Sequence, residues 1–251
     1  MLLTELIQTL RVDFLDDVAE PYLWSDPELV SKIIEAEKEA CERANLIIDD
    51  STPEICHIAV QQGVMGYTLD DRVLLVRRAS FGTSSTSTYP LTQTTKARAD
   101  ETHPGWNNHT GTPGVYICEE NGSIIIAPAA AGTTGTDGIV STAGTAGTAF
   151  LQVSRYPLNR MTLNSTAGTG TAGKGITYPE IPPSYHYKML HWAAHLAFLK
   201  NDSETFNAAK ADKHAGLFAQ YFGLPIDAAT KQFMRSNNLN SPRMRPREFG
   251  S

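Results

Sequence analysis

The sequence predicts an α+β protein: a helical bundle built from N- and C-terminal helices, with a small antiparallel β-sheet subdomain inserted between them. Apolar residues recur at helical spacing in the first and last parts of the chain, and with a period near two in the middle. The final stretch has prolines, arginines and little periodicity, which predicts an extended C-terminal arm. We expect residues 1–54 to form the N-terminal helices, 55–180 the β-rich insertion with Gly/Thr/Ala-rich loops, 181–236 the C-terminal helices and 237–251 the arm.

Two amphipathic helices are predicted near the N-terminus. Apolar residues recur every three or four positions between residues 3 and 15, and again between residues 29 and 47. Ser25 and Glu28 form a capping-box pattern, and Pro27 suits a first helical turn because its missing N–H would be unpaired there. The second helix should therefore begin near Asp26.

The middle of the chain predicts short strands. Cys56, Ile58 and Val60 alternate with polar neighbours, and residues 72–81 indicate a further strand. Residues 115–118 and 123–127 flank an Asn-Gly pair that favours a tight turn, so they predict a hairpin. Residues 92–101 could form a short helix between these strands.

Residues 129–175 are crowded with Gly, Thr and Ala. We interpret this tract as a flexible strand-and-loop excursion that buries little, built around a strand at residues 150–156. Helices return after Ile181: residues 189–199 carry a broad apolar stripe, and residues 206–221 form a second helix that Gly223 and Pro225 end. A last short helix is expected near residues 227–234.

Composition excludes several classes of protein. The 251 residues carry a net charge of −6, which argues against a uniformly basic nucleic-acid binder. The first fifty residues hold 13 acidic side chains against 4 basic ones. The three cysteines are far apart in the sequence, so neither a disulfide framework nor a cysteine zinc site is expected. We expect no membrane span and no signal peptide.

No motif predicts an enzyme or a cofactor. Gly168, Gly173 and Lys174 resemble a phosphate-binding loop, but Gly175 stands where Ser or Thr would bind magnesium, and prolines follow. Cys56 and His57 are adjacent on a predicted strand and so point to opposite faces. Paired acidic residues lie at predicted turns and helix ends, where solvated carboxylates and N-caps are the ordinary explanation.

His191 and His195 are four residues apart on a predicted helix, so both imidazoles lie on one side of it. This spacing occurs in metal sites, but Trp192 stands where the glutamate of such a motif would be. No nearby acidic residue clearly supplies a third ligand. We therefore favour histidines that pack between helices and predict no metal.

The order of these segments resembles the head-to-tail adaptor, or connector, proteins of tailed bacteriophages. The resemblance extends from about Leu3 to Gly223, and none of its motifs is catalytic. The positions that carry it are moderately specific and keep one order: Tyr22-Leu23-Trp24-Ser25-Asp26, the strand at residues 73–78 after Leu69-Asp70, Ile181-Pro182, His186, Trp192-Ala193, Ala197-Phe198, Asp202, Glu204 and Lys210-Ala211.

The resemblance implies a structural, non-enzymatic component of the virion neck, made in the cytoplasm of a bacterial host. Such a protein would self-associate into a homo-oligomeric ring of about twelve copies below the portal protein. The ring would join the capsid to tail or nozzle proteins and surround the DNA channel used in genome ejection. DNA would pass through the lumen without specific binding.

Two sets of residues are candidates for this role. We expect the arm to insert against the portal, with its arginines meeting acidic surface and Phe249 acting as an apolar anchor. Acidic residues of the N-terminal helices would flank the channel and repel DNA. The portal-binding residues are Ser241, Pro242, Arg243, Met244, Arg245, Pro246, Arg247, Glu248 and Phe249, and the channel-facing residues are Asp16, Asp17 and Glu20.

Two other functions remain open at this point. The chain could be a different neck or tail-completion protein, such as a ring stopper that attaches below the adaptor. A less favoured alternative is a metal-dependent enzyme that uses His191 and His195.

Overall fold

The computed structural model describes residues 1–84, 87–119, 122–130, 145–163, 176–225, 227 and 230. It divides the chain into two compact units. We call Met1–Ile48 with Arg155–Ile226 the helical unit, and Asp49–Ser154 with Asp227–Ser251 the β unit. Of the described residues, 155–163 and 176–180 fall within the helical unit.

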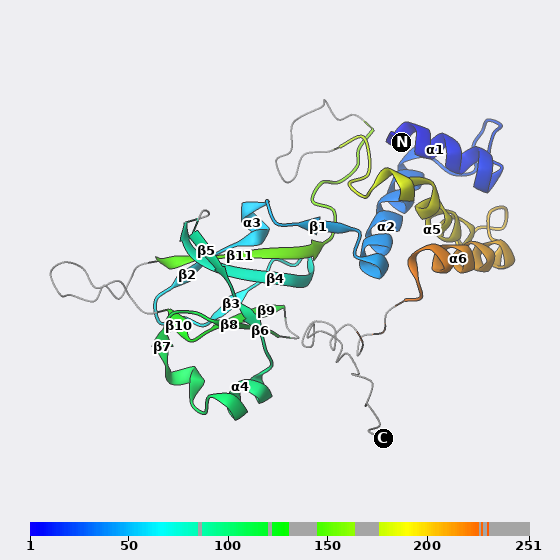
Figure 1. Cartoon of the computed structure of the whole chain (residues 1–251). Coiled ribbons are helices and arrows are strands. Elements are labelled where there is room, and N and C mark those ends of the chain that lie inside the picture. The colour runs from blue at the N-terminus through cyan, green and yellow to red at the C-terminus, as the bar shows by residue number, and fades with distance from the viewer. Residues whose placement is uncertain are drawn as a thin grey trace, which may run out of the picture. The chain divides into compact units, whose positions relative to one another are not determined.

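The helical unit begins with a continuous helical segment whose second half is a π-helix. α2 starts at Asp26, as predicted, and the Ser25–Glu28 capping box is present, with the Ser25 N–H 3.0 Å from Glu28 Oε2. Figure 1 shows these helices from dark blue to orange. The helices are α1 (Leu3–Thr9), η1 (Leu10–Leu15), α2 (Asp26–Ala44), η3 (Pro183–Tyr185), α5 (His186–Phe198) and α6 (Ala208–Phe222).

α5 is the helix around which this unit packs, because it contacts α2, α6 and η1. Leu29 and Ile33 of α2, Leu190 of α5 and Phe218 of α6 have no exposed surface. Each such side chain contributes about 1.5–3 kcal/mol by leaving water. The predicted helix after residue 206 begins later, because Asn207 is the N-cap; its side chain accepts the Lys210 N–H.

The described residues form two main sheets, which lie mostly in the β unit, where the sequence predicted one. The first has the order β1-β11-β4-β5, with β2 also paired to β11, and the second has the order β3-β9-β8-β6. β6 runs parallel to β8, and β7 parallel to β10, so the unit is not wholly antiparallel. The strands are β1 (Ile47–Asp49), β2 (His57–Gln61), β3 (Gly66–Thr68), β4 (Val73–Ser84), β5 (Ser87–Pro90), β6 (Thr92–Gln93), β7 (Thr110–Gly111), β8 (Val115–Cys118), β9 (Ser123–Ala127), β10 (Ala129–Ala130) and β11 (Thr145–Arg155).

Two predictions from local sequence signals are confirmed within the β unit. The β8–β9 hairpin has the predicted bounds, with Val115 opposite Ala127 and Cys118 opposite Ile124. The predicted short helix is α4 (Lys96–Thr102), where the Thr95 side chain accepts the Arg98 N–H. The remaining helical turns are α3 (Pro53–Cys56) and η2 (Trp106–Asn108).

β11 corrects the prediction that the Gly/Thr/Ala-rich tract buries little. Ala149, Leu151 and Val153 are almost fully buried, and the strand lies inside the first sheet between β1 and β4. A Cβ on Gly147 would lie 2.6 Å from Phe81 Cζ, so the small residue permits close packing. Residues 131–144 and 164–175, which include the Gly168-to-Lys174 motif, lie outside the described part of the chain.

None of the helices in the described ranges is both long and apolar enough to cross a membrane.

Candidate functional site

The turn that joins η1 to α2 is held by a buried ion pair. Arg11 donates to the Asp17 carboxylate and also to the Trp24 carbonyl at 2.6 Å and Asp26 Oδ1 at 2.8 Å. Asp17 accepts the backbone N–H groups of Leu23, at 2.9 Å, and Trp24, at 3.3 Å. Removing either charge would leave its partner buried with fewer compensating contacts, which is energetically costly. The ion pair therefore holds this turn in place relative to the helices.

Asp16, Asp17 and Glu20 therefore differ in position, although the sequence grouped them. Asp17 is buried and its carboxylate is engaged within the fold. Asp16 and Glu20 are exposed, and Asp16 adopts a left-handed conformation with φ of 57°. Of the three, Asp16 and Glu20 can present charge to another molecule.

Apolar side chains are exposed beside these two carboxylates. Val18 is 59% exposed and Tyr22 45% exposed, although the buried ion pair fixes the turn that carries them. The Tyr22 ring lies over the Arg11 guanidinium, 4.0 Å from it. These exposed apolar side chains are accessible to another molecule. We call this surface the N-terminal corner: Val12, Asp16, Val18, Glu20, Tyr22 and Leu23.

His191 and His195 lie where α5 packs on α6, as predicted. His191 Nδ1 is 3.0 Å from His214 Nδ1, whereas His195 Nδ1 donates to the Ala211 carbonyl at 2.9 Å. Burial lowers the pKa of His191, and burial together with His191 and nearby lysines lowers the pKa of His214 to about 4. The His191–His214 pair is therefore uncharged at neutral pH and serves helix packing.

The described residues contain no group of three His, Cys, Asp or Glu side chains that could hold a metal ion. Cys41, Cys56 and Cys118 are free thiols and all are buried. The two histidines that the sequence singled out thus have different partners and gather no third ligand within this part of the chain.

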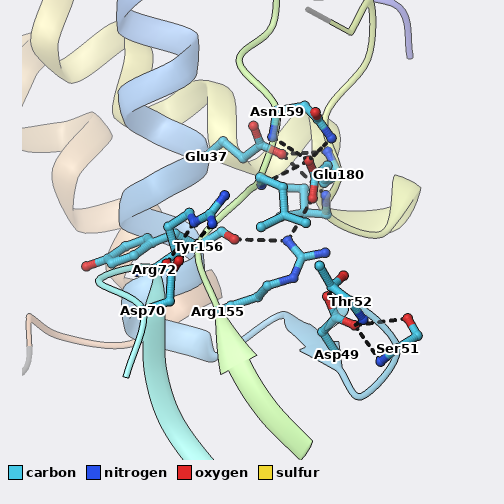
Figure 2. Close-up of polar contacts among 12 residues, drawn as sticks. Glu37, Asp49, Ser51, Thr52, Asp70, Arg72, Arg155, Tyr156, Asn159 and Glu180 are labelled. Atoms are coloured by element: carbon cyan, nitrogen blue, oxygen red, sulfur yellow. Dashed lines mark hydrogen bonds and ion pairs between the residues drawn. The ribbon is translucent and has the colours of Figure 1, made fainter. Parts of the chain in front are cut away.

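Glu37 and Glu180 form a polar cluster that sequence reasoning missed (Figure 2). Glu37 of α2 accepts the N–H of Glu180 at 2.6 Å and that of Ile181 at 3.4 Å. Burial raises the pKa of Glu37 to about 7, against the opposing effect of these two hydrogen bonds. The cluster ties the segment before α5 to α2.

Glu180 anchors the same segment from its other side. It accepts Arg155 Nη1 at 2.8 Å, the Leu158 N–H at 3.0 Å and both the backbone and side-chain amide of Asn159, at 2.7 and 2.9 Å. One signal could have revealed the cluster: Glu37 falls midway between Ile33 and Cys41, on the buried stripe of its helix.

Asp49 and Asp70, the first residues of the paired acids Asp49-Asp50 and Asp70-Asp71, have structural roles within the β unit, as expected for carboxylates at turns. Asp49 accepts the Ser51 and Thr52 N–H groups at 2.9 and 3.1 Å, just before α3, and Asp70 pairs with Arg72 at 2.8 Å. The portal-binding candidates of the arm, residues 241–249, lie outside the described residues.

The model of the SU10 adaptor protein family matches residues 1–244. Because the match covers nearly the whole sequence, the chain belongs to this family of phage head-to-tail adaptor proteins, which confirms the resemblance found in the sequence. No curated protein matches the sequence.

Proposed function

We propose that this chain is a structural adaptor that joins the phage head to its tail by forming a ring below the portal and around the DNA channel. The match of the adaptor family to residues 1–244 carries this proposal. The ring would contain about twelve copies with closed cyclic symmetry, so each copy needs two different lateral surfaces. This role needs no chemical step and no cofactor.

The N-terminal corner supports the proposal as a lateral or channel-side surface. Val18 and Tyr22 could be covered by a neighbouring copy, while Asp16 and Glu20 would keep negative charge near passing DNA. Asp17 would act indirectly, because its pairing with Arg11 positions the turn. Neutralising both exposed carboxylates, in Asp16→Asn with Glu20→Gln, should slow genome ejection from assembled particles; an unchanged ejection rate would contradict this assignment.

The arm is the proposed portal contact. Arg243, Arg245 and Arg247 would pair with acidic portal surface, and Phe249 would supply an apolar anchor. The arm would become ordered on docking, and this ordering cost would be offset by the new contacts.

Native mass spectrometry of the chain mixed with its portal protein tests both claims. The full chain should add about twelve copies to the portal ring, the expected stoichiometry of a closed ring. A chain ending at residue 240 should keep its circular-dichroism spectrum and thermal midpoint but add none. Equal co-assembly of the two chains would refute the role of the arm, and no co-assembly of the full chain would refute the adaptor role.

A ring-stopper-like protein is the alternative neck component. Mixing the chain with tail proteins instead of the portal separates the two possibilities. Binding to the tail side alone would favour the stopper.

A further inference from the structure

The β unit contains a cavity of about 800 Å³. Its walls come from β4, β6, β8, the end of β9 and the segment from α4 to η2, all between residues 77 and 128. Pockets of roughly 300–1,000 Å³ are the size that encloses small ligands or a few side chains. The adaptor role as proposed above leaves this cavity without a function.

The floor of the cavity is apolar. Leu91, Ala99, Tyr116 and Ala127 all line it and are buried. Trp106 adds an aromatic ring, and its indole Nε1 donates to Asp100 Oδ1 at 2.8 Å, which fixes the ring's orientation. An apolar side chain entering from outside would therefore meet a preformed apolar surface.

The same cavity is lined by three arginines and by no Asp or Glu among the described residues. Arg77 Nε donates to the uncharged Ser154 hydroxyl at 2.7 Å, and neither Arg78 nor Arg98 forms an ion pair with any described residue. Arg77 and Arg78 are exposed, as is Arg98. In a chain of net charge −6, this local excess of positive charge complements a carboxylate-bearing ligand.

We propose that this cavity docks a short acidic segment of a partner protein that carries one bulky apolar side chain. The apolar side chain would lie on Leu91 and Tyr116, and its neighbouring carboxylates would pair with Arg78 and Arg98. Arginine beside buried aromatic surface is the composition that dominates binding energy at protein interfaces. Duplex DNA fits less well, because its phosphates lie on a convex surface and it offers no apolar group to the floor.

The identification of the partner as a component of the phage neck or tail rests on the proposed function. The chemistry of the cavity is argued independently of that function. The test therefore uses random octapeptides displayed on yeast and selected against the full chain. The selected peptides should be enriched in Asp and Glu next to Phe, Leu or Trp. A synthetic version of a selected peptide, with Asn and Gln in place of its Asp and Glu residues, should bind at least about tenfold more weakly, since charge-assisted hydrogen bonds are lost.

Variants locate the binding to this cavity. Arg78→Gln and Arg98→Gln should each weaken binding of the selected peptide at least about tenfold. Arg160 is an exposed arginine of the helical unit, and Arg160→Gln should leave binding unchanged. Gly114 lines the cavity and a Cβ there meets open space, so Gly114→Phe should block binding while leaving the arginines intact. Gly114→Ala is its matched control, and circular dichroism checks that all variants fold.

Three outcomes would overturn the proposal: a selected pool without acidic enrichment, equal binding by the cavity variants, or tighter binding of a 12-nucleotide single strand that displaces the peptide. Because the portal takes no part in this experiment, its failure leaves the adaptor role standing. A failed portal assembly likewise leaves the cavity result valid.

Discussion

Glu37 shows at the residue scale how a buried acid makes stability depend on pH. Its pKa of about 7 in the folded chain exceeds the ordinary value of 4.5, mainly because burial penalises the charged form. The folded chain therefore holds a proton that the unfolded chain releases, so the contribution of Glu37 to stability is complete below pH 4.5 and is lost as pH rises to about 7.

Glu37→Gln should remove this dependence while keeping an oxygen that accepts the Glu180 and Ile181 N–H groups. At pH 8 the variant should be more stable than the parent by roughly 1–3 kcal/mol, and near pH 4.5 the difference should shrink. Urea unfolding at several pH values measures this. Glu35→Gln, at an exposed position of the same helix, is the control, and parallel pH profiles of parent and Glu37→Gln would contradict the account.

The Arg11–Asp17 pair gives a second test at this scale. Asp17→Asn would leave the Arg11 guanidinium with only the exposed Asp26 as a counter-charge, and we expect a loss of roughly 3 kcal/mol. Asp16→Asn, one residue earlier, should change stability by less than about 0.5 kcal/mol, because its side chain is exposed and Asn tolerates the left-handed conformation. If Asp17→Asn and Asp16→Asn lowered the thermal unfolding midpoint equally, the ion pair would not fix this turn.

At the scale of elements, the sequence predicts structure well where the signal is local. The capping box predicts the start of α2, and the Asn-Gly pair in the sequence predicts β8 and β9, since both signals depend on neighbouring residues. It fails where pairing is long-range: β11 pairs with β2, far away in the sequence, and β6 pairs with β8 in parallel across α4. Neither register is encoded in a short window of residues.

β11 also shows why composition misled. Its small residues suggested a strand that packs little, yet Gly147 lies against Phe81 and Gly82. Glycine composition alone does not distinguish a flexible segment from one where two backbones approach closely. The polar cluster around Glu180 was missed for a related reason: burial of a charge depends on which distant segment covers it.

Gly147→Ala should destabilise the β unit, because the added methyl would lie 2.6 Å from Phe81 Cζ and 2.8 Å from the Gly82 oxygen. We expect a loss of about 1–3 kcal/mol. Gly216→Ala is the matched control in α6, where a Cβ meets nothing within 4 Å, and it should stabilise by up to about 1 kcal/mol. Chemical denaturation of both variants should show changes of opposite sign in the free energy of unfolding. If Gly147→Ala stabilised the protein, close packing at this strand would be contradicted.

On the scale of the whole molecule, the family assignment rests on many positions in order, and no single site carries it. The resemblance could be read from the sequence because its moderately specific positions are spread along most of the chain, and the family model likewise matches residues 1–244. The N-terminal corner and the cavity could not be read from the sequence, because the corner depends on a buried ion pair and the cavity on strands brought together from separate parts of the chain.

The central claim is that this chain occupies the junction between head and tail. A cryo-electron microscopy reconstruction of the neck of a particle that encodes it tests this most directly. The account predicts a ring of about twelve copies between portal and tail, with residues 241–249 in contact with the portal. A complete neck whose density leaves no place for this chain would contradict it.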